Sequence, residues 1–281
     1  MTVIDVRRRA VVADIAGVPA PHGVLVVPAL GRVFASATAA HELVTLDAAT
    51  YRVLVRTRAG RFPDGIAYDP AERRLFVSDE SGGAEIVIDP ASGQCTGVIA
   101  LGGQAGNVAY EPGGGQSGGG RVLVAVQSRD QLAVIDPRSE RITARVPLPG
   151  CDNDHGLLVD TRARLAFVAC DHNARLLVVD LDQMRMTATH RVGRSPDVLA
   201  LDPGLGLLYV AAESGTVTVF AEQGRGLVRR GAGVMPSAHA VAVDPRTHLV
   251  YLPLERQGGR PVLRVMAPVI TPPPPPPGDG S

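Results

Sequence analysis

The sequence predicts an all-β protein, a β-propeller built from four-stranded antiparallel blades. Three observations lead to this prediction: a repeat of 42 residues runs through the chain, each repeat holds four short runs rich in Val, Ile and Leu, and Gly, Pro and Asp bound these runs. Such runs are typical of β-strands. Four strands in a repeat of this length are typical of a propeller blade, and a two-layer sandwich would not explain so regular a repeat.

The first run of each repeat shows the period most clearly. Its second residue lies at positions 22, 64, 106, 155, 197 and 239, so the spacing is 42 in every case except one, where it is 49. The longer interval contains the glycine-rich segment 113–120, which we interpret as a flexible insertion. These runs are apolar almost throughout, as expected for strands that neighbouring blades cover on both faces.

The other runs of each repeat follow in a constant order. A turn, often Asp-Pro, leads to a second run such as residues 74–77, Arg-Leu-Phe-Val. The third run ends in Asp four times, and we interpret these residues as turn formers because turn residues follow them. A weaker fourth run closes the repeat. The four aspartates are Asp47, Asp89, Asp136 and Asp180.

The two ends of the chain hold incomplete repeats. Residues 2–5 and 10–15 match the third and fourth strands of a blade, and the last repeat shows three strands, the last of them at 261–266. Either six blades close through 10–15, which leaves 2–5 surplus, or the protein has a seven-bladed origin and lacks an upstream segment; we favour the second. We expect one propeller domain over 1–267 and a disordered proline-rich tail over 268–281.

The composition disfavours several classes of function. All 28 basic residues are Arg, so Schiff-base chemistry and a P-loop lysine are excluded. The 28 acidic residues balance them and Trp is absent, which disfavours a nucleic-acid partner. No stretch is apolar enough to span a membrane, and the N-terminal residues lack the apolar part of a signal peptide. We expect a monomer.

Two rings of mostly polar residues are expected around one mouth of the central channel. In each blade, the start of the first strand and the end of the second lie at the same end of a hairpin, and the first strand lines the channel. The first ring is His22, Asp64, Gly106 with Asn107 beside it, His155, Asp197 and His239. The second ring is Thr38, Glu80, Gln127, Asp171, Glu213 and Glu255, and we expect Asp79, Asp152 and Asp154 to add to this face.

Imidazoles and carboxylates on one face suit a ligand or a divalent metal ion. The candidate metal ligands are His22, His155 and His239, and a His near carboxylates could also act as a general base without a metal. The structural alternative is that Asp64 and Asp197 accept hydrogen bonds from nearby backbone amides and that the second ring is a solvated rim. We interpret the remaining histidines as surface or loop residues that lack the ring register: His41, His172, His190 and His248.

Two of the three cysteines are expected close together at the same mouth. Cys151 precedes the first strand of its blade and Cys170 ends the second, so a hairpin that turns near Ala163 brings them together. A disulfide is expected if the protein is exported. In the cytosol, the two thiols could instead join a metal site. Cys95 lies in a predicted turn.

The repeat also resembles a known family. The pattern Pro-His/Asp-Gly-apolar-Ala-apolar-Asp-Pro, then Arg-Leu-Phe-Val, then apolar-Val-Ile-Asp, resembles the YVTN-type repeat of YncE-like bacterial β-propeller proteins, over residues 2–266. The resemblance implies export to the periplasm or cell surface, and many proteins of this kind have no assigned reaction. Some propeller lyases are similar in placing His and a metal near the channel. This chain departs from the family because it starts within a blade and lacks a signal peptide.

The function predicted from these observations is that of a non-enzymatic binding or scaffold module, which presents an acidic, His-containing channel mouth to a small ligand or a protein. The alternative is a metal-dependent lyase or hydrolase with its site at the same mouth. A divalent metal ion is the cofactor that this pattern suggests. The chain has no G-x-S-x-G, no H-E-x-x-H and no dinucleotide-binding fingerprint.

Overall fold

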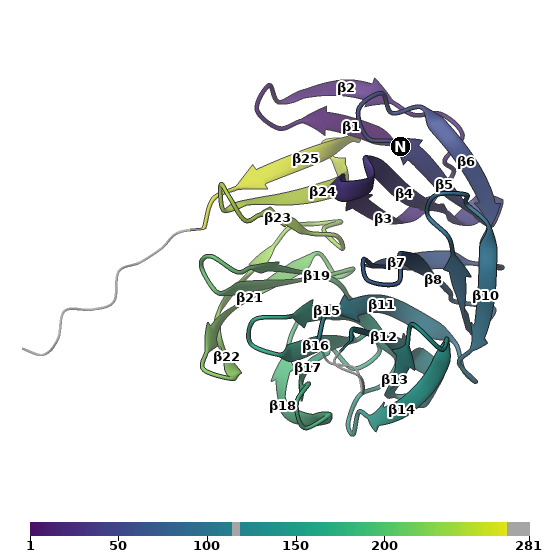
Figure 1. Cartoon of the computed structure of the whole chain (residues 1–281). Coiled ribbons are helices and arrows are strands. Elements are labelled where there is room, and N and C mark those ends of the chain that lie inside the picture. The colour runs from purple at the N-terminus through teal and green to yellow at the C-terminus, as the bar shows by residue number, and fades with distance from the viewer. Residues whose placement is uncertain (114–118, 269–281) are drawn as a thin grey trace, which may run out of the picture.

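The computed structural model describes residues 1–113 and 119–268 and shows a β-propeller (Figure 1). Six antiparallel blades stand in a ring, five of them with four strands and the sixth with three. The predicted fold class is therefore confirmed. Residues 114–118 of the glycine-rich insertion and all of the predicted tail beyond Pro268 lie outside the described residues.

Each four-stranded blade runs outward from its innermost strand in chain order. The strands of the first three blades are β3 (Pro21–Val27), β4 (Arg32–Ala37), β5 (Glu42–Asp47), β6 (Val53–Arg58); β7 (Pro63–Asp69), β8 (Arg74–Asp79), β9 (Ala84–Ile88), β10 (Cys95–Ala100); and β11 (Ala105–Glu111), β12 (Arg121–Val126), β13 (Gln131–Asp136), β14 (Arg141–Pro147). The strands of the next two are β15 (Asp154–Asp160), β16 (Leu165–Cys170), β17 (Arg175–Asp180), β18 (Arg185–Arg191); and β19 (Pro196–Asp202), β20 (Leu207–Ala212), β21 (Thr216–Gln223), β22 (Gly226–Val234).

The sixth blade and the N-terminal segment are shorter sheets. The sixth blade consists of β23 (Ala242–Asp244), β24 (Leu249–Gln257) and β25 (Arg260–Met266), and β1 (Thr2–Asp5) and β2 (Ala10–Asp14) form a two-stranded sheet. Short 3-10 helices follow three of the strands: η1 (Pro28–Leu30), η2 (Thr38–Ala40) and η3 (Gln127–Arg129). None of the helices in the described part of the chain is long and apolar enough to cross a membrane.

The hydrophobic core lies between the blades. One large side chain in the second strand of a blade recurs at the repeat period, as Phe34, Phe76 and Phe167, and each of these is fully buried. Burial of one such side chain contributes roughly 1.5–3 kcal/mol relative to an exposed position. Val108 and Tyr110 of β11 pack in the same cluster as Phe76 of the preceding blade. The innermost strand therefore faces the blade before it, which fixes the order of the ring.

The aspartates that end the third strands form turns, as predicted. Asp89 Oδ1 accepts hydrogen bonds from the backbone N–H groups of Ala91 and Ser92, at 3.0 and 2.7 Å. Asp180 Oδ1 accepts two at 2.9 Å, from the backbone N–H groups of Asp182 and Gln183. These carboxylates are part of the scaffold because their oxygens bind the chain that follows them.

The N-terminal hairpin does not close the sixth blade. Strand β2 pairs with β1, and in the described residues β25 pairs only with β24, so the interpretation in which 10–15 completes a six-bladed ring is wrong. The hairpin has the geometry of the outer half of a blade. Ile15 N–H donates to Met1 O at 2.8 Å, as Leu101 N–H donates to Gly83 O at 2.9 Å in the second blade. The seven-bladed origin stays a prediction.

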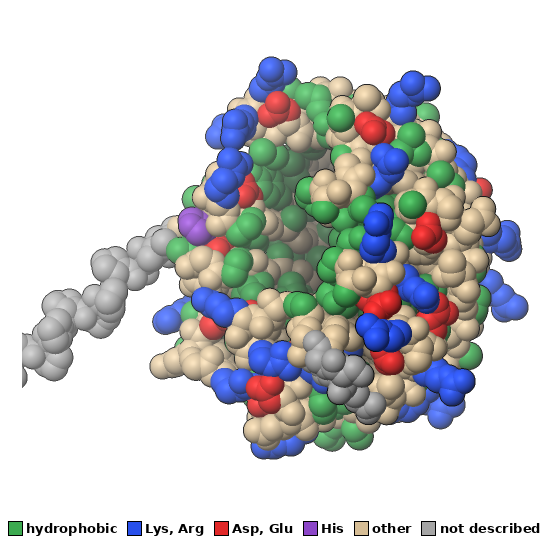
Figure 2. Space-filling view, in the orientation of Figure 1, with side chains coloured by type: hydrophobic (Ala, Val, Ile, Leu, Met, Phe, Trp, Pro, Cys, Tyr) green, Lys and Arg blue, Asp and Glu red, His purple; other side chains and the backbone are tan. Residues whose placement is uncertain are grey.

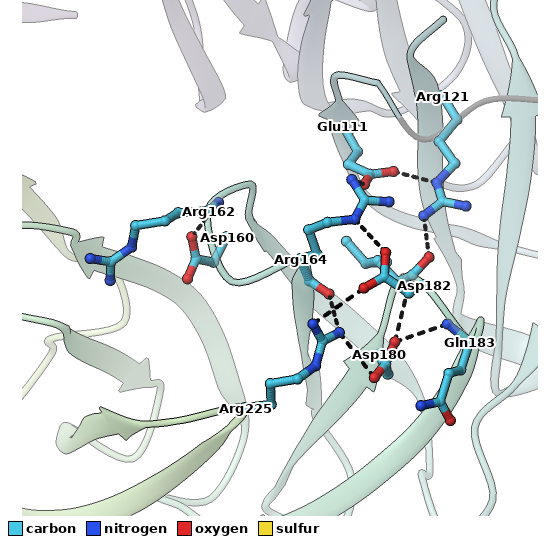
Figure 3. Close-up of polar contacts among 10 residues, drawn as sticks. Glu111, Arg121, Asp160, Arg162, Arg164, Asp180, Asp182, Gln183 and Arg225 are labelled. Carbon is cyan, nitrogen blue, oxygen red and sulfur yellow. Dashed lines mark hydrogen bonds and ion pairs between the residues drawn. The ribbon is translucent and has the colours of Figure 1, made fainter. Parts of the chain in front are cut away.

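An ion network joins three blades at the end of the ring opposite the predicted mouth (Figure 3). The fully buried carboxylate of Glu111 on β11 pairs with Arg121 of β12 and, at 2.8 Å, with Arg164 of the fourth blade. Arg164 also pairs with Asp182. Arg225 Nη1 of the fifth blade lies 3.2 Å from Asp182 Oδ2. Glu111 and Asp182 at this end therefore pair with arginines from neighbouring blades.

Candidate functional site

One cavity of about 1060 Å³ collects all ten residues that were predicted to bind a ligand. It opens at the end of the ring where the innermost strands begin. We call it the mouth cavity. The predicted residues that line it are His22, Asp64, Glu80, Asn107, His155, Asp171, Asp197, Glu213, His239 and Glu255. Gln127 of the second ring also lines it.

A β-bulge places the first-ring residue of each four-stranded blade. On β7, Pro63 lies opposite Asp79 and Ile66 lies opposite Val77, so two residues of β7 occupy the interval of one residue on β8. The same shift occurs near the start of β3, β11, β15 and β19. Bulges redirect side chains and break the regular alternation of a strand. In these five blades the first-ring residue therefore lies in a backbone bulge that recurs from repeat to repeat.

The glycine after the ring residue lets neighbouring strands approach closely. A Cβ atom built on Gly23 would lie 2.2 Å from Asp64 O of the next blade, and one on Gly156 would lie 2.0 Å from Asp197 O. No Cβ atom tolerates such distances to backbone, so a larger residue would push the two innermost strands apart. The Pro-His/Asp-Gly pattern of the repeat thus combines a channel-facing side chain with a tight contact between blades.

His155 lies at the centre of the polar contacts in the mouth cavity. Its Nε2 atom is 3.3 Å from Asp197 Oδ1 and 3.9 Å from Asp64 Oδ2, and His22 Nδ1 lies 3.9 Å from Asp64 Oδ1. Burial by itself would lower the pKa of His155, but the hydrogen bond to Asp197 and the charges of the neighbouring carboxylates outweigh it and raise the pKa to about 9. His155 is therefore an imidazolium at neutral pH, held between two carboxyl groups.

Asp64 is buried and faces histidines, and it does not serve a turn. Burial raises the pKa of Asp64, and the nearby His155 and His22 oppose that shift. In the described residues, the side-chain carboxylates of Asp64 and Asp197 accept no hydrogen bond from a backbone amide. Ser36 Oγ donates a hydrogen bond at 2.5 Å, but to the main-chain oxygen of Asp64. The structural alternative for these two carboxylates is therefore not supported by their contacts.

Two other carboxylates expected at the mouth point into the scaffold instead. Asp79 Oδ1 accepts hydrogen bonds from the backbone N–H groups of Arg61 and Phe62, at 2.8 and 2.9 Å. Asp154 is fully buried, its Oδ2 accepts a hydrogen bond from Val126 N–H at 2.9 Å, and burial raises its pKa to about 8. The expectation that these residues add to the polar face is wrong, because each lies outside the bulge and turns toward the neighbouring backbone.

Three further residues expected at this face, Thr38, Gly106 and Asp152, do not line the mouth cavity. Thr38 is buried, and its hydroxyl donates to Pro63 O at 2.6 Å. Gly106 does not line the cavity; its neighbour Asn107 does. The exposed carboxylate of Asp152 does not line the cavity either and lies 3.4 Å from His172 Nδ1.

Several residues that line the mouth cavity were not predicted from the sequence. Gln104, Asn153 and Ser237 each come two positions before a first-ring residue, so the same register would have found them. Gln104 Nε2 donates to Glu80 Oε1 at 2.8 Å. His172 follows a second-ring residue and also lines the cavity, although it lies in a turn as expected. Whether His172 reaches the cavity depends on the conformation of its turn, which the residue spacing does not determine.

The mouth cavity is strongly acidic. None of its lining residues is an arginine, and the chain contains no lysine. Within the described residues, the side chains of Glu213 and Glu255 form no hydrogen bond or ion pair, so they face the cavity with their charges unneutralised. The carboxylates that line it are Asp64, Glu80, Asp171, Asp197, Glu213 and Glu255.

The metal site of His22, His155 and His239 stays a prediction. The three side chains line the same cavity, but within residues 1–113 and 119–268 no group of three or more His, Cys, Asp or Glu side chains is arranged to hold a metal ion. Cys151 and Cys170 form a disulfide, with their Cα atoms 5.4 Å apart. Their sulfur atoms are therefore not thiolate ligands in this structure.

Comparison with known proteins shows the fold and no closer relationship. No protein-family model and no curated protein matches the chain. Among solved structures, it is similar to a functionally unknown protein from Desulfotomaculum acetoxidans, with 12% identity, a TM-score of 0.73 and coverage of 95% of this chain and 96% of that one. It is also similar to hydrazine synthase from Kuenenia stuttgartiensis, with 18% identity, a TM-score of 0.71 and coverage of 86% and 78%.

A third similar structure is a β-propeller domain from Myceliophteria thermophila, with 14% identity, a TM-score of 0.66 and coverage of 87% of each chain. At these identities the likeness establishes the propeller architecture alone. Because unrelated functions occur on the same fold, it assigns none of these proteins' activities to this chain.

Proposed function

We propose that the protein is a binding module and that the mouth cavity holds a positively charged group of its ligand. The observation that carries this proposal is the set of six carboxylates in a cavity without a basic side chain other than histidine, in a chain whose net charge is zero. A concave site with an excess of one sign of charge concentrates ligands of the opposite sign.

The arrangement of the histidines supports a binding role. His155 is protonated and already occupied by Asp64 and Asp197, so it fixes these two carboxylates rather than acting as a base at neutral pH. The outer carboxylates, such as Glu213 and Glu255, carry no such partner within the described residues. An ammonium or guanidinium group of a ligand would pair with them.

Isothermal titration with a tetra-arginine peptide tests the proposal. We expect saturable binding that weakens as ionic strength rises from about 0.05 to about 0.5 M, because salt screens exposed charges. A tetra-glutamate peptide should not bind. The double variant Glu213→Gln/Glu255→Gln should weaken binding by about fivefold to thirtyfold, since each exposed ion pair contributes roughly 0.5–1 kcal/mol.

Asp14→Asn provides the matched control, because Asp14 is an exposed carboxylate on β2 outside the mouth cavity. It should bind the peptide as the natural protein does. Equal weakening by Asp14→Asn would mean that the peptide responds to net charge alone, and the mouth would lose its assignment.

The metal-dependent lyase or hydrolase remains the second candidate that the sequence suggested, and no contact in the described residues favours it over binding. Elemental analysis of the purified protein, beside His155→Ala, separates the two. About one equivalent of Zn, Mn or Ca that disappears in the variant would favour a metal site. Absence of bound metal after incubation with excess ions would leave the binding module.

We also propose that the chain is a YVTN-type, YncE-like protein that acts outside the cytoplasm. The repeat pattern supports the family, and the Cys151–Cys170 disulfide supports an oxidising compartment. Fractionation of the native cells, with the disulfide assayed by thiol labelling before and after reduction, tests this proposal. Recovery of the protein in the cytoplasm with both thiols reduced would contradict it.

A further inference from the structure

Part of the mouth-cavity wall, on the second, third and fourth blades, is a continuous hydrogen-bonded arc. Gln104 Nε2 donates to Glu80 Oε1 at 2.8 Å, and Gln127 N–H donates to Gln104 O at 2.9 Å. Asn153 Nδ2 donates to Gln127 Oε1 at 3.0 Å, and Asn153 O accepts from Asp171 N–H at 2.9 Å. We call this set the rim arc, and all its members line the cavity: Glu80, Gln104, Gln127, Asn153 and Asp171.

The hydrogen-bond partners of the amides fix their orientation. Gln104 donates to a carboxylate, and Gln127 Nε2 donates to the main-chain oxygen of Ala105 at 2.7 Å. These partners can only accept, so each must face an NH2 group, and Gln127 Oε1 is then left to receive the NH2 group of Asn153. In the described residues, no hydrogen bond uses the carbonyl oxygens Gln104 Oε1 and Asn153 Oδ1. The unused side-chain oxygens of the arc are therefore acceptors.

Two further polar groups without hydrogen bonds lie deeper in the cavity wall. Asp64 is only 7% exposed, its carboxylate accepts no hydrogen bond in the described residues, and the nearest nitrogens of His22 and His155 are 3.9 Å away. The half-buried side chain of Asn107 also lines the cavity and forms no hydrogen bond within residues 1–113 and 119–268. A buried acceptor without a donor costs free energy, so a ligand that brings N–H groups would be stabilised here.

The protein satisfies the same combination of acceptors elsewhere with arginine. At the end opposite the mouth, the guanidinium group of Arg121 donates from Nε to the Glu111 carboxylate and from Nη2 to the main-chain oxygen of Leu181 at 2.6 Å (Figure 3). On the face of the ring that Figure 2 views, arginines and acidic side chains are interspersed. No arginine lines the mouth cavity, so the carboxylate of Glu80 and the amide oxygen of Gln104 lack such a partner there.

We propose that the mouth cavity binds the guanidinium group of an arginine side chain from another polypeptide, through the free carboxylate and amide oxygens of the rim arc. This inference rests on the proposed function and deepens it, because it names the charged group of the ligand and the molecule that carries it. A guanidinium group has five N–H donors and no acceptor, so it matches a wall whose unused oxygens are acceptors.

An ammonium group suits this wall less well. It is a compact, strongly hydrated charge, whereas guanidinium is planar, more weakly hydrated and donates along several edges. The acceptors of the rim arc are spread over segments of three blades, and those of Gln104 and Asn153 are neutral. Neutral oxygens replace the hydration shell of an ammonium group poorly, so a guanidinium group enters at a lower desolvation cost.

The charge of the cavity also specifies what carries the guanidinium group. Free arginine brings its own carboxylate, which the six carboxylates of the cavity would repel, and no lining arginine offsets that repulsion. An arginine within a polypeptide has no such group. The cavity, at about 1060 Å³, is larger than one side chain and opens at the end of the ring, so residues next to the arginine have room to follow it.

Isothermal titration with three acetylated and amidated peptides tests the charged group: tetra-arginine, tetra-lysine and tetra-citrulline, in which a neutral urea replaces the guanidinium. We expect tetra-lysine to bind at least about fivefold more weakly than tetra-arginine, and tetra-citrulline to show no saturable binding. Tetra-lysine that binds as tightly as tetra-arginine would overturn this inference and leave the proposed function intact. Absence of binding by all three peptides would end both.

A double variant tests the amide oxygens. Gln104→Leu/Asn107→Leu removes two amides from the wall and no carboxylate, so the ratio of the tetra-lysine and tetra-arginine dissociation constants should fall below about twofold. Gln94→Leu is the matched control, because Gln94 is an exposed glutamine of the second blade outside the cavity, and it should keep the ratio of the natural protein. An unchanged ratio in the double variant, or an equal fall in Gln94→Leu, would refute the role of these amides.

Competition by agmatine and by free L-arginine tests the carrier, since the two molecules differ only by the carboxylate of arginine. Agmatine should displace tetra-arginine at a concentration at least about fivefold lower than L-arginine does, because the cavity repels the carboxylate. Equal displacement would show that the cavity accepts the free amino acid, and the assignment to a polypeptide would fail. It would also fail if agmatine bound as tightly as tetra-arginine, because a small guanidine would then be sufficient.

Discussion

The two ends of this propeller use the same kinds of acidic residue for different purposes. At the end opposite the mouth, Glu111 is buried against Arg121 and Arg164, and Asp180 binds the backbone of its own turn. At the mouth, no arginine lines the cavity, and the partners of Asp64 and Asp197 are histidines. A carboxylate paired with arginine or with the backbone holds blades together, whereas one that faces a cavity remains available to a ligand.

Loss of an arginine at the opposite end should have the largest effect on stability. Arg121→Met leaves the buried Glu111 carboxylate with Arg164 as its remaining charged partner. Removal of one member of a buried ion pair costs about 3 kcal/mol or more, since the other charge stays desolvated. We expect a loss of this size in denaturant unfolding, with unchanged binding of the tetra-arginine peptide.

The double variant Arg121→Met/Glu111→Leu should recover much of that loss, because it removes the buried Glu111 carboxylate together with its Arg121 partner. A loss below about 1 kcal/mol in Arg121→Met would mean that water or Arg164 replaces the pair, and the opposite end would then be less rigid than the contacts indicate.

The mouth should stabilise the protein in a pH-dependent way through His155. Its folded-state pKa of about 9 lies above the ordinary value of 6.5, so its contribution is complete below pH 6.5 and is lost as pH rises through 9. Asp64, whose pKa is also raised, changes stability in the same direction. The natural protein should therefore exceed His155→Gln in unfolding free energy by about 3 kcal/mol at pH 6, and by much less at pH 9.5.

Urea unfolding of both proteins across this pH range measures the difference. His190→Gln is the control: the pKa of His190 is lowered by burial, so its variant should not reproduce the loss between pH 6.5 and 9. A constant difference between the natural protein and His155→Gln at all pH values would show that His155 is not protonated in the fold.

The repeat made the fold and the site register predictable, but not every contact. Residues 42 apart occupy equivalent places, so the first ring could be placed from spacing alone. The spacing does not encode whether a carboxylate turns inward or outward. Asp64 lies in the bulge and faces the channel, whereas Asp79, at the end of the paired strand, turns toward the backbone of Arg61 and Phe62.

The ends of the chain were harder to place for a related reason. A half-blade at the N-terminus can pair with the last blade or stand as the outer part of another, and both choices bury apolar residues. The pairing of β2 with β1 and the packing of Val3 with the first blade decide between them, and both depend on three-dimensional packing. Sequence spacing favoured one of the two arrangements but does not show which strand the segment 10–15 pairs with.

A smaller effect should distinguish Asp197, which contacts His155 directly, from Asp171, which only lines the same cavity. Asp197 lies 3.3 Å from His155 Nε2, so Asp197→Asn should lower the pKa of His155 by about one unit, which NMR titration of the histidine ring measures directly. Asp171 lines the same cavity but pairs with His172, so Asp171→Asn should leave the titration of His155 unchanged. Equal shifts in the two variants would indicate a diffuse field instead of a specific pair.

The smallest expected effect compares one carboxylate at each end, the half-buried Asp89 and the exposed Glu213. Asp89 Oδ1 accepts hydrogen bonds from Ala91 and Ser92, so Asp89→Ala should cost about 1 kcal/mol in unfolding free energy, through loss of the turn. Glu213 has no such partner in the described residues, and Glu213→Ala should stay within about 0.5 kcal/mol of the natural protein. If thermal unfolding instead showed Glu213→Ala to be the more damaging change, the mouth would be part of the scaffold, and the distinction between the two ends would fail.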